Sequence, residues 1–223
     1  MHTSPLTSIV VFHLGPVPIT QAVVTTWVIM LALTVVCHLV TRRLALNPDR
    51  RQIVLEILVT GIARQIEDVI RKDARPYLPL IGTLFIFLAT ANLCGVLPGV
   101  EAPTGKVETP AALALIVFFS VHYFGVRGRG LMGYLTSFAE PKLIMLPLNI
   151  ISEVTRTFSL MVRLFGNVMS GGFVMALVVA LAGLLVPIPL MVLEILVGLV
   201  QAYIFTVLAT VFIGAAVGTV TKA

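Results

Sequence analysis

The sequence is poor in charged residues. Asp, Glu, Lys and Arg make up only 11% of its 223 residues, whereas soluble domains average about 25%. Hydrophobic residues make up 58% of the chain, and several apolar runs reach the roughly 20 residues that a helix needs to cross a bilayer. This composition excludes an ordinary soluble domain and predicts a polytopic membrane protein.

Residues that would support chemistry within the chain are also scarce. The two cysteines, Cys37 and Cys94, lie inside apolar runs, and the histidines are scattered, so no metal-ligand spacing arises. No glycine-rich phosphate loop or nucleophile motif is found. The net charge of +5 marks loops and does not indicate nucleic acid, because eight of the fifteen Lys and Arg residues lie in 42–75. We therefore expect no metal, no cofactor and no nucleic-acid partner.

The apolar runs predict an all-α membrane domain that occupies residues 1–223. We expect spans at about 19–40, 77–97 and 111–126, an amphipathic helix at 50–75 that lies on a membrane surface or covers a partner, and two overlong helices at 143–186 and 190–220. For residues 50–75, a plain linker between spans is the alternative. Arg42 and Arg43 follow the first span, so the positive-inside rule predicts an N-terminus outside the cell.

The last two helices are too long for simple spans. As one helix, residues 143–186 would extend about 65 Å, twice the thickness of the hydrocarbon core. Pro187 and Pro189 then predict a turn before the second helix. We expect a helical hairpin that lies strongly tilted in the membrane. Ordinary spans with surface extensions are the alternative, because length alone fixes no tilt angle.

Polar residues recur at helical spacing along this hairpin. In the first helix these residues are Arg156, Ser159, Arg163, Asn167 and Ser170, and in the second they are Glu194, Gly198 and Gln201. Residues three and four apart share a helix face, and intramembrane ionisable residues often mark an ion path. Two plainer interpretations remain: Arg156 fits a snorkelling or structural residue, and Arg163 and Glu194 could pair as structural ions.

The run SLMVRLFGNVMSG at 159–171 closely resembles the signature of subunit a of the rotary F-type ATP synthase, the membrane stator that faces the c-ring. The resemblance extends to NLCGVLPG at 92–99, PTGKVETPAALAL at 103–115 and EILVGLVQAYIF at 194–205. It implies a multi-pass subunit of the bacterial inner membrane that is not catalytic by itself. The implied partners are the c-ring, the peripheral-stalk b subunits and membrane lipid.

The resemblance also implies roles for individual residues. Arg163 would face the passing c-ring carboxylates and separate two aqueous half-channels, because a fixed cation favours the ionised carboxylate and arginine stays charged. Residues Asn167, Ser170, Glu194 and Gln201 would belong to the ion path, with Glu194 as the relay of the outward-facing half-channel and Gln201 orienting Arg163. Glu153 would lie towards the cytoplasmic exit.

Three positions depart from the family pattern. Gly172 stands where relatives often carry an acid or a histidine, Lys106 where many carry an aspartate, and Thr157 where a proline is common. The route of the inlet and the choice between H⁺ and Na⁺ therefore stay open. A stand-alone secondary transporter with a mid-membrane site is the alternative function, although no inverted repeat is visible. A purely structural subunit would leave Arg163 and Glu194 unexplained.

Overall fold

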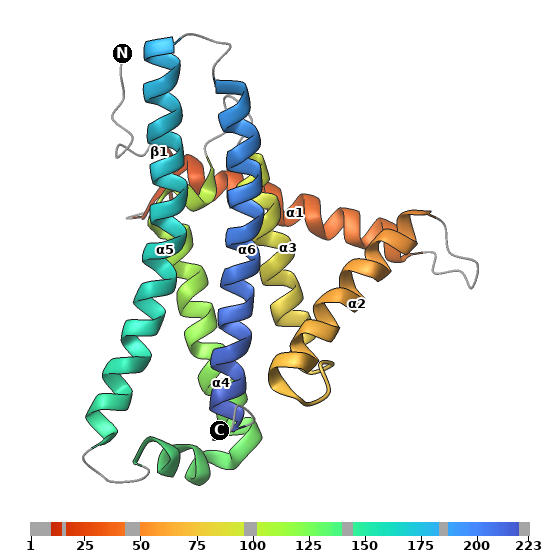
Figure 1. The fold of residues 1–223 in the computed structure, drawn as a ribbon, viewed down its shortest axis with the longest axis vertical. Coiled ribbons are helices and arrows are strands. Elements are labelled where there is room, and N and C mark those ends of the chain that lie inside the picture. The colour runs from red at the N-terminus through yellow and green to blue at the C-terminus, as the bar shows by residue number, and fades with distance from the viewer. Residues whose placement is uncertain are drawn as a thin grey trace.

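The computed structural model describes residues 10–14, 17–42, 50–95, 102–139, 145–182 and 187–218. Its elements in chain order are the strands β1 (Val10–Leu14) and β2 (Val17–Thr20), the helices α1 (Gln21–Thr41), α2 (Arg50–Ile70) and α3 (Leu78–Cys94), the 3-10 turn η1 (Pro103–Gly105), and the helices α4 (Glu108–Ala139), α5 (Met145–Ala182) and α6 (Pro187–Val217) (Figure 1). The predicted fold class, an all-α polytopic membrane protein, is confirmed. Parts of the predicted segments lie outside the described residues, namely 43, 96–97, 143–144, 183–186 and 219–220.

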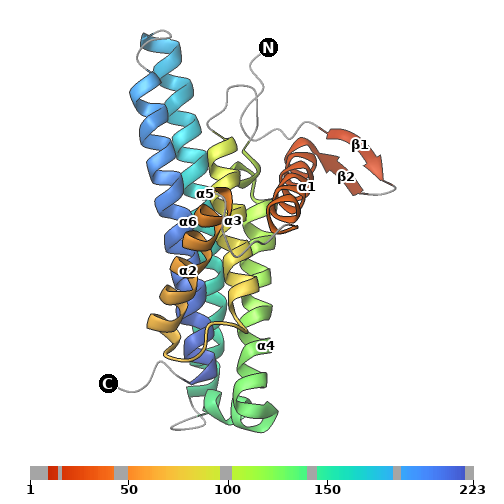
Figure 2. The same cartoon turned by 90° about the vertical axis from the view of Figure 1, so that its right-hand side faces the viewer.

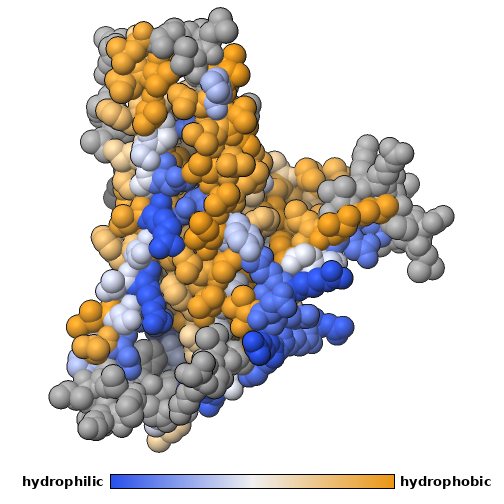
Figure 3. Space-filling model, in the orientation of Figure 1, coloured by the Kyte–Doolittle hydropathy of each residue, from blue (hydrophilic) through white to orange (hydrophobic). Residues whose placement is uncertain are grey.

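Within the described ranges, four helices are long and apolar enough to cross a membrane. They are α1, α4, α5 and α6, whereas α3 is apolar but shorter, at 17 residues. The surface is also largely apolar. Hydrophobic residues cover much of α5 and α6, while hydrophilic residues gather over the outer side of α2 (Figure 3). The chain is therefore a membrane protein.

Helix α6 lies at the centre of the packing. It contacts α2, α3, α4 and α5, and it contributes fully buried side chains such as Phe205, Ala209 and Ile213 to the core. Helices α4, α5 and α6 run along the long axis of the molecule, whereas α1 lies across that direction (Figures 1 and 2). The helices that carry the polar residues are thus held by a scaffold of apolar contacts.

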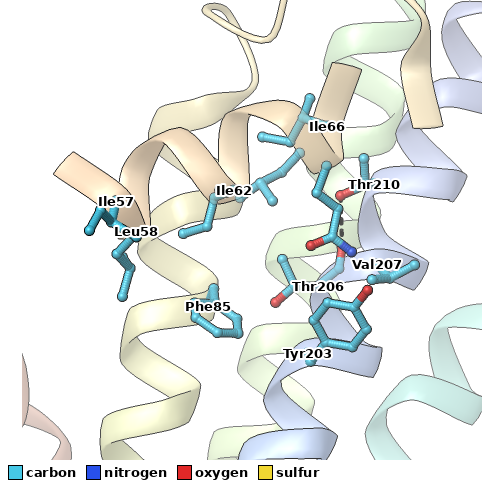
Figure 4. A pocket seen from close by; sticks show the side chains of 12 residues that line it. Ile57, Leu58, Ile62, Ile66, Phe85, Tyr203, Thr206, Val207 and Thr210 are labelled. Carbon is cyan, nitrogen blue, oxygen red and sulfur yellow. Dashed lines mark hydrogen bonds between the residues drawn. The ribbon is translucent and has the colours of Figure 1, made fainter. Parts of the chain in front are cut away.

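Helix α2 is amphipathic, as its sequence pattern predicts. Ile62, Ile66 and Ile70 are buried at intervals of four residues, which places them on one helix face. This face packs towards α3 and α6 but leaves a groove of about 330 Å³. In Figure 4, Ile62 and Ile66 face Phe85 of α3 and the polar side chains of Tyr203, Thr206 and Thr210 of α6 across this groove.

Helix α4 extends well beyond the span expected at 111–126. It continues to Ala139 with a break at Gly130, whose φ of 75° and ψ of 161° are a combination open essentially to glycine alone. Beyond this break Tyr134 packs directly against Gly125, where a Cβ atom would collide with the ring. Arg127 and Arg129, which come directly after the span expected at 111–126, therefore lie within the helix, just before this break.

The short sheet is a feature that the sequence-based expectation lacked. Strands β1 and β2 pair in antiparallel fashion, with Leu14 opposite Val17 and Val10 opposite Thr20. The sequence held a signal for it, because β-branched and aromatic residues lie on both sides of Gly15-Pro16, a pair of residue types that is common in turns. The two paired strands lead directly into α1, and the helical fold class is unchanged.

Candidate functional site

The polar stripe of α5, defined as Arg156, Ser159, Arg163, Asn167 and Ser170, lies beside the packed face of the helix. Leu160 and Leu164 are 2% and 0% exposed, whereas all the stripe residues are exposed except Asn167, which is half-buried. Figure 3 shows the corresponding line of hydrophilic residues along α5 within a hydrophobic face. The stripe thus lies on the outer surface of the helix bundle, next to the face of α5 that packs against the other helices.

Arg163 is exposed although it follows apolar residues on an apolar helix. In the described part of the chain, no ion pair joins it to Glu194 and no hydrogen bond joins it to Gln201. The interpretation of Arg163 and Glu194 as a structural ion pair is therefore wrong for this conformation. The guanidinium is available to a group outside the chain.

Glu194 lies where α6 meets α5. Its side chain is half-buried, and its Oε1 atom lies 2.6 Å from the position that a Cβ atom would occupy on Gly171. A side chain at residue 171 would therefore displace the carboxylate. The neighbouring Ser170 hydroxyl donates to the backbone oxygen of Asn167 at 3.0 Å, so it bonds its own helix.

Two contacts set the antiparallel register of α5 and α6. Glu194 lies against Gly171, and the Arg156 guanidinium carbon lies 5.6 Å from the centroid of the Phe212 ring. Arg163 is eight residues before Gly171, and Gln201 is seven residues after Glu194. At 1.5 Å per residue, Arg163 and Gln201 therefore lie at nearly the same height, roughly 10–12 Å from the Glu194 contact.

Gln201 is only 7% exposed, and its Nε2 atom is buried without a hydrogen-bond partner in the described structure. Leaving a buried donor unsatisfied costs about 1–3 kcal/mol. Because this group lowers the stability of the isolated chain, we interpret it as a group that is kept for function. It also fits a position that water reaches in the assembled protein.

Glu153 lies apart from these residues. It precedes Arg163 by ten residues on α5, about 15 Å along the helix, and its carboxylate is close enough to interact electrostatically with Tyr134 of α4. The structure therefore brings Glu194, Gln201 and Arg163 into one stretch of the hairpin and leaves Glu153 outside it.

Asn92 was missed as a site residue by the sequence reasoning. It is 7% exposed near the end of α3, and its Nδ2 atom donates to the backbone oxygen of Gly198 at 2.8 Å, between Glu194 and Gln201 on α6. The signal that could have found it is a carboxamide in an otherwise apolar run. As for metals, no three His, Cys, Asp or Glu side chains gather in a metal-binding group within the described ranges.

Comparisons with known proteins agree on one family. Residues 23–214 match the family model described as ATP synthase A chain. The chain is 79% identical to ATP synthase subunit a 2 of a Bradyrhizobium species over 222 residues, which cover 100% of both chains. It is 49% identical to ATP synthase subunit a 1 of Chlorobaculum parvum, over 98% of this chain and 97% of that relative. It is 48% identical to ATP synthase subunit a of Albidiferax ferrireducens, over 97% and 94% of the two chains.

Proposed function

Because the chain belongs to the ATP synthase A chain family, we propose that it carries ions past Arg163 to a rotating c-ring within the ATP synthase. The observation that carries this proposal is the exposed guanidinium of Arg163 on an apolar helix. An arginine at the centre of a bilayer helix costs about 2.5–3.5 kcal/mol on insertion scales. A carboxylate on an opposing subunit would offset that cost.

Arg163 acts as a fixed charge between two ion paths. When a c-ring carboxylate arrives, the guanidinium favours its ionised form, so the bound H⁺ or Na⁺ leaves into one half-channel. The same charge repels ions that would pass directly from one half-channel to the other. Arginine suits this role because its guanidinium does not lose its proton, whereas a buried lysine can.

Glu194 is the relay of the outward-facing half-channel. Its half-buried carboxylate lies at the seam of α5 and α6 against Gly171, which is the kind of position from which a carboxylate can exchange ions with a narrow aqueous path. Asn167, Ser170 and Gln201 line the path towards Arg163. Glu153, about 15 Å from Arg163 along α5, belongs to the cytoplasmic exit.

Helix length and direction support a proposed placement of the chain in the membrane. Helix α5 has 38 residues, about 57 Å, nearly twice the hydrocarbon thickness, whereas the 21 residues of α1 match it. Because α1 lies across the direction of α4, α5 and α6 (Figures 1 and 2), a spanning α1 leaves these three helices strongly tilted. In this placement α1, α3 and α4 span the bacterial inner membrane, α2 lies on the cytoplasmic surface, and the N-terminus is outside.

The partners cover the faces that this chain leaves open. The exposed side of α5 faces the c-ring, because it carries the polar stripe with Arg163 and because only 6% of the most apolar 18-residue stretch of this helix is buried within the chain. Helix α1 exposes large apolar side chains, including Trp27 and Leu31 at 55% and 70%, to lipid and to the peripheral-stalk b subunits. The alternative of a stand-alone transporter has no support from the family match.

The deciding experiment replaces Arg163 by alanine in the assembled enzyme. We expect Arg163→Ala to abolish ATP-driven ion pumping in membrane vesicles while the complex still assembles, because the charge that releases the ion is gone. Arg156→Ala is the matched control from the same stripe, and it should retain pumping. Normal coupled pumping by Arg163→Ala would defeat the proposal.

A second variant tests the relay. Glu194→Gln keeps the size of the side chain but removes the titratable group, so ion flux should slow in both directions. Flux should be measured over a range of driving forces. Unchanged flux at all of them would remove the relay role from Glu194 but would not affect the role proposed for Arg163.

A further inference from the structure

Asn92 connects three elements through both ends of its side chain. Its Nδ2 atom donates to the backbone oxygen of Gly198 on α6 at 2.8 Å, and its Oδ1 atom accepts from the hydroxyl of Thr104 in η1 at 3.0 Å. We call these two hydrogen bonds the Asn92 bridge. Asn92 and Thr104 are 7% and 0% exposed, so the bridge is shielded from competition by solvent.

The chemistry of the partners fixes the orientation of the amide. A backbone oxygen only accepts hydrogen bonds, so the nitrogen of Asn92 must face Gly198. The oxygen then faces Thr104, whose hydroxyl must donate. By contrast, the hydroxyl of Thr90, two residues earlier on α3, donates to its own helix at Ile86. Asn92 thus bonds two other elements, whereas Thr90 bonds only its own helix.

The contact on α6 depends on a glycine. A Cβ atom on Gly198 would lie 3.0 Å from the Cβ atom of Asn92, closer than ordinary van der Waals contact. Gly198 lies four residues after Glu194 and three before Gln201, so all three share a helix face. The Asn92 bridge therefore holds α6 midway between the two polar side chains of the proposed ion path.

The other end of the bridge is anchored as firmly. Pro103 and Thr104 in η1 are fully buried, and η1 contacts α1, α3, α4 and α5. The position of a Cβ atom on Gly105 lies 3.5 Å from Val168 of α5, next to Asn167 in the polar stripe. The bridge thus joins α6 to a turn that itself rests on α5.

We propose that Asn92 is a positioning residue that, together with Thr104, fixes the rotation of α6 so that Glu194 faces Gly171. The apolar contacts of α6 cannot do this alone, because they are non-directional and because helices in a membrane have little hydrophobic drive to pack. Hydrogen bonds are directional, so they select one rotation. The part of the proposal that concerns ion flux rests on the proposed function of Glu194, whereas the part that concerns rotation does not.

Disulfide formation between α5 and α6 measures the rotation directly. The pair Gly171→Cys and Glu194→Cys is introduced into a chain with Cys37→Ala and Cys94→Ala, within the assembled enzyme. Because a disulfide needs Cβ atoms about 3.5–4.5 Å apart, a rotated α6 should cross-link several-fold more slowly under mild oxidation. We expect this slowing with Asn92→Ala and, to a smaller extent, with Thr104→Val.

Two controls separate positioning from general damage. Thr104→Ser keeps the donor and should restore the native cross-linking rate. Thr90→Val removes a hydroxyl that bonds its own helix and should leave the rate unchanged. All rates are expressed per assembled subunit, so a loss of assembly alone does not imitate the effect. An unchanged rate in both Asn92→Ala and Thr104→Val would overturn the proposal.

Ion flux in the cysteine-free background distinguishes this proposal from the proposed function. Misplacement of a reacting group by about 1 Å can cost on the order of a hundredfold, so Asn92→Ala should lower flux per complex at least tenfold on that scale. If Glu194→Gln leaves flux unchanged while Asn92→Ala slows cross-linking, the positioning role stands and the relay role fails. If Glu194→Gln slows flux while cross-linking is unaffected by Asn92→Ala, the relay stands and the positioning role is overturned.

Discussion

The two helices of the C-terminal hairpin are almost equally apolar, yet this chain buries them very differently. The most apolar 18-residue stretch of α5 has a mean hydropathy of 2.0 and is 6% buried, whereas that of α6 has a mean hydropathy of 2.2 and is 39% buried. Hydropathy reports transfer from water into the membrane and says nothing about which face meets protein. Only the packing distinguishes the inner helix from the outer one.

The polar residues of the two helices differ accordingly. Arg156 and Arg163 on α5 are exposed, whereas Gln201 on α6 is buried. A polar group on α5 can therefore serve a partner outside the chain, while a polar group on α6 must find its partners inside the bundle or in water that enters it. The four predictions below test this division of roles.

The largest difference should appear in stability. Phe205 on α6 is 1% exposed and Phe158 on α5 is 60% exposed. Phe205→Ala should lower the unfolding free energy of the purified subunit by about 3–5 kcal/mol because it opens a cavity in the core, whereas Phe158→Ala should change it by about 0.5 kcal/mol or less. Denaturant unfolding in detergent micelles measures both changes, and equal losses of unfolding free energy would contradict the difference in burial between α5 and α6.

Two adjacent glycines of α5 differ in their contact with α6. Gly171 lies against the Glu194 carboxylate, whereas nothing lies within 4 Å of a Cβ atom placed on Gly172. Gly171→Ala should displace the carboxylate and reduce ion flux about tenfold. Gly172→Ala should leave flux unchanged and stabilise the helix by about 0.5–1 kcal/mol. Equal effects of the two variants on flux would show that Glu194 needs no fixed position.

Gln201 tests whether a buried polar group on α6 is kept for function. Gln201→Leu removes the orphaned donor, so the unfolding free energy of the isolated subunit should rise by about 1 kcal/mol, while ATP-driven flux falls. The same micelle unfolding assay and vesicle pumping assay give the two values. A loss of stability would mean that the amide is satisfied in the native subunit.

The smallest effect concerns the contact of Arg156 with α6. Its guanidinium lies over the Phe212 ring, and such cation–π contacts contribute about 0.5–1 kcal/mol at exposed sites. Arg156→Ala should cost that amount, and the cost should vanish in a Phe212→Leu background. A full double-mutant cycle is the measurement, and zero coupling would leave Arg156 as a residue without a structural partner on α6.

Local patterns located most of the helices but missed features that depend on special backbone or on distance. The amphipathic period of residues 50–75 led to α2, and polar spacing led to the stripe on α5. The extension of α4 was missed because Arg127 and Arg129 end the apolar run at residue 126, whereas the helix continues through a break at Gly130. The Asn92 bridge was missed because it joins residues 106 positions apart, which no local period encodes.

Three conclusions needed no structure: this chain is a membrane protein, its last helices are too long for simple spans, and Arg163 lies on a polar line. These conclusions follow from composition and from the 3.6-residue period, both of which are local properties. The folded chain was needed to find that α6 is central and α5 peripheral, that Glu194 lies against a glycine, and that Asn92 bonds Gly198. Those facts depend on which apolar faces meet, and apolar surfaces are too alike in sequence to name their partners.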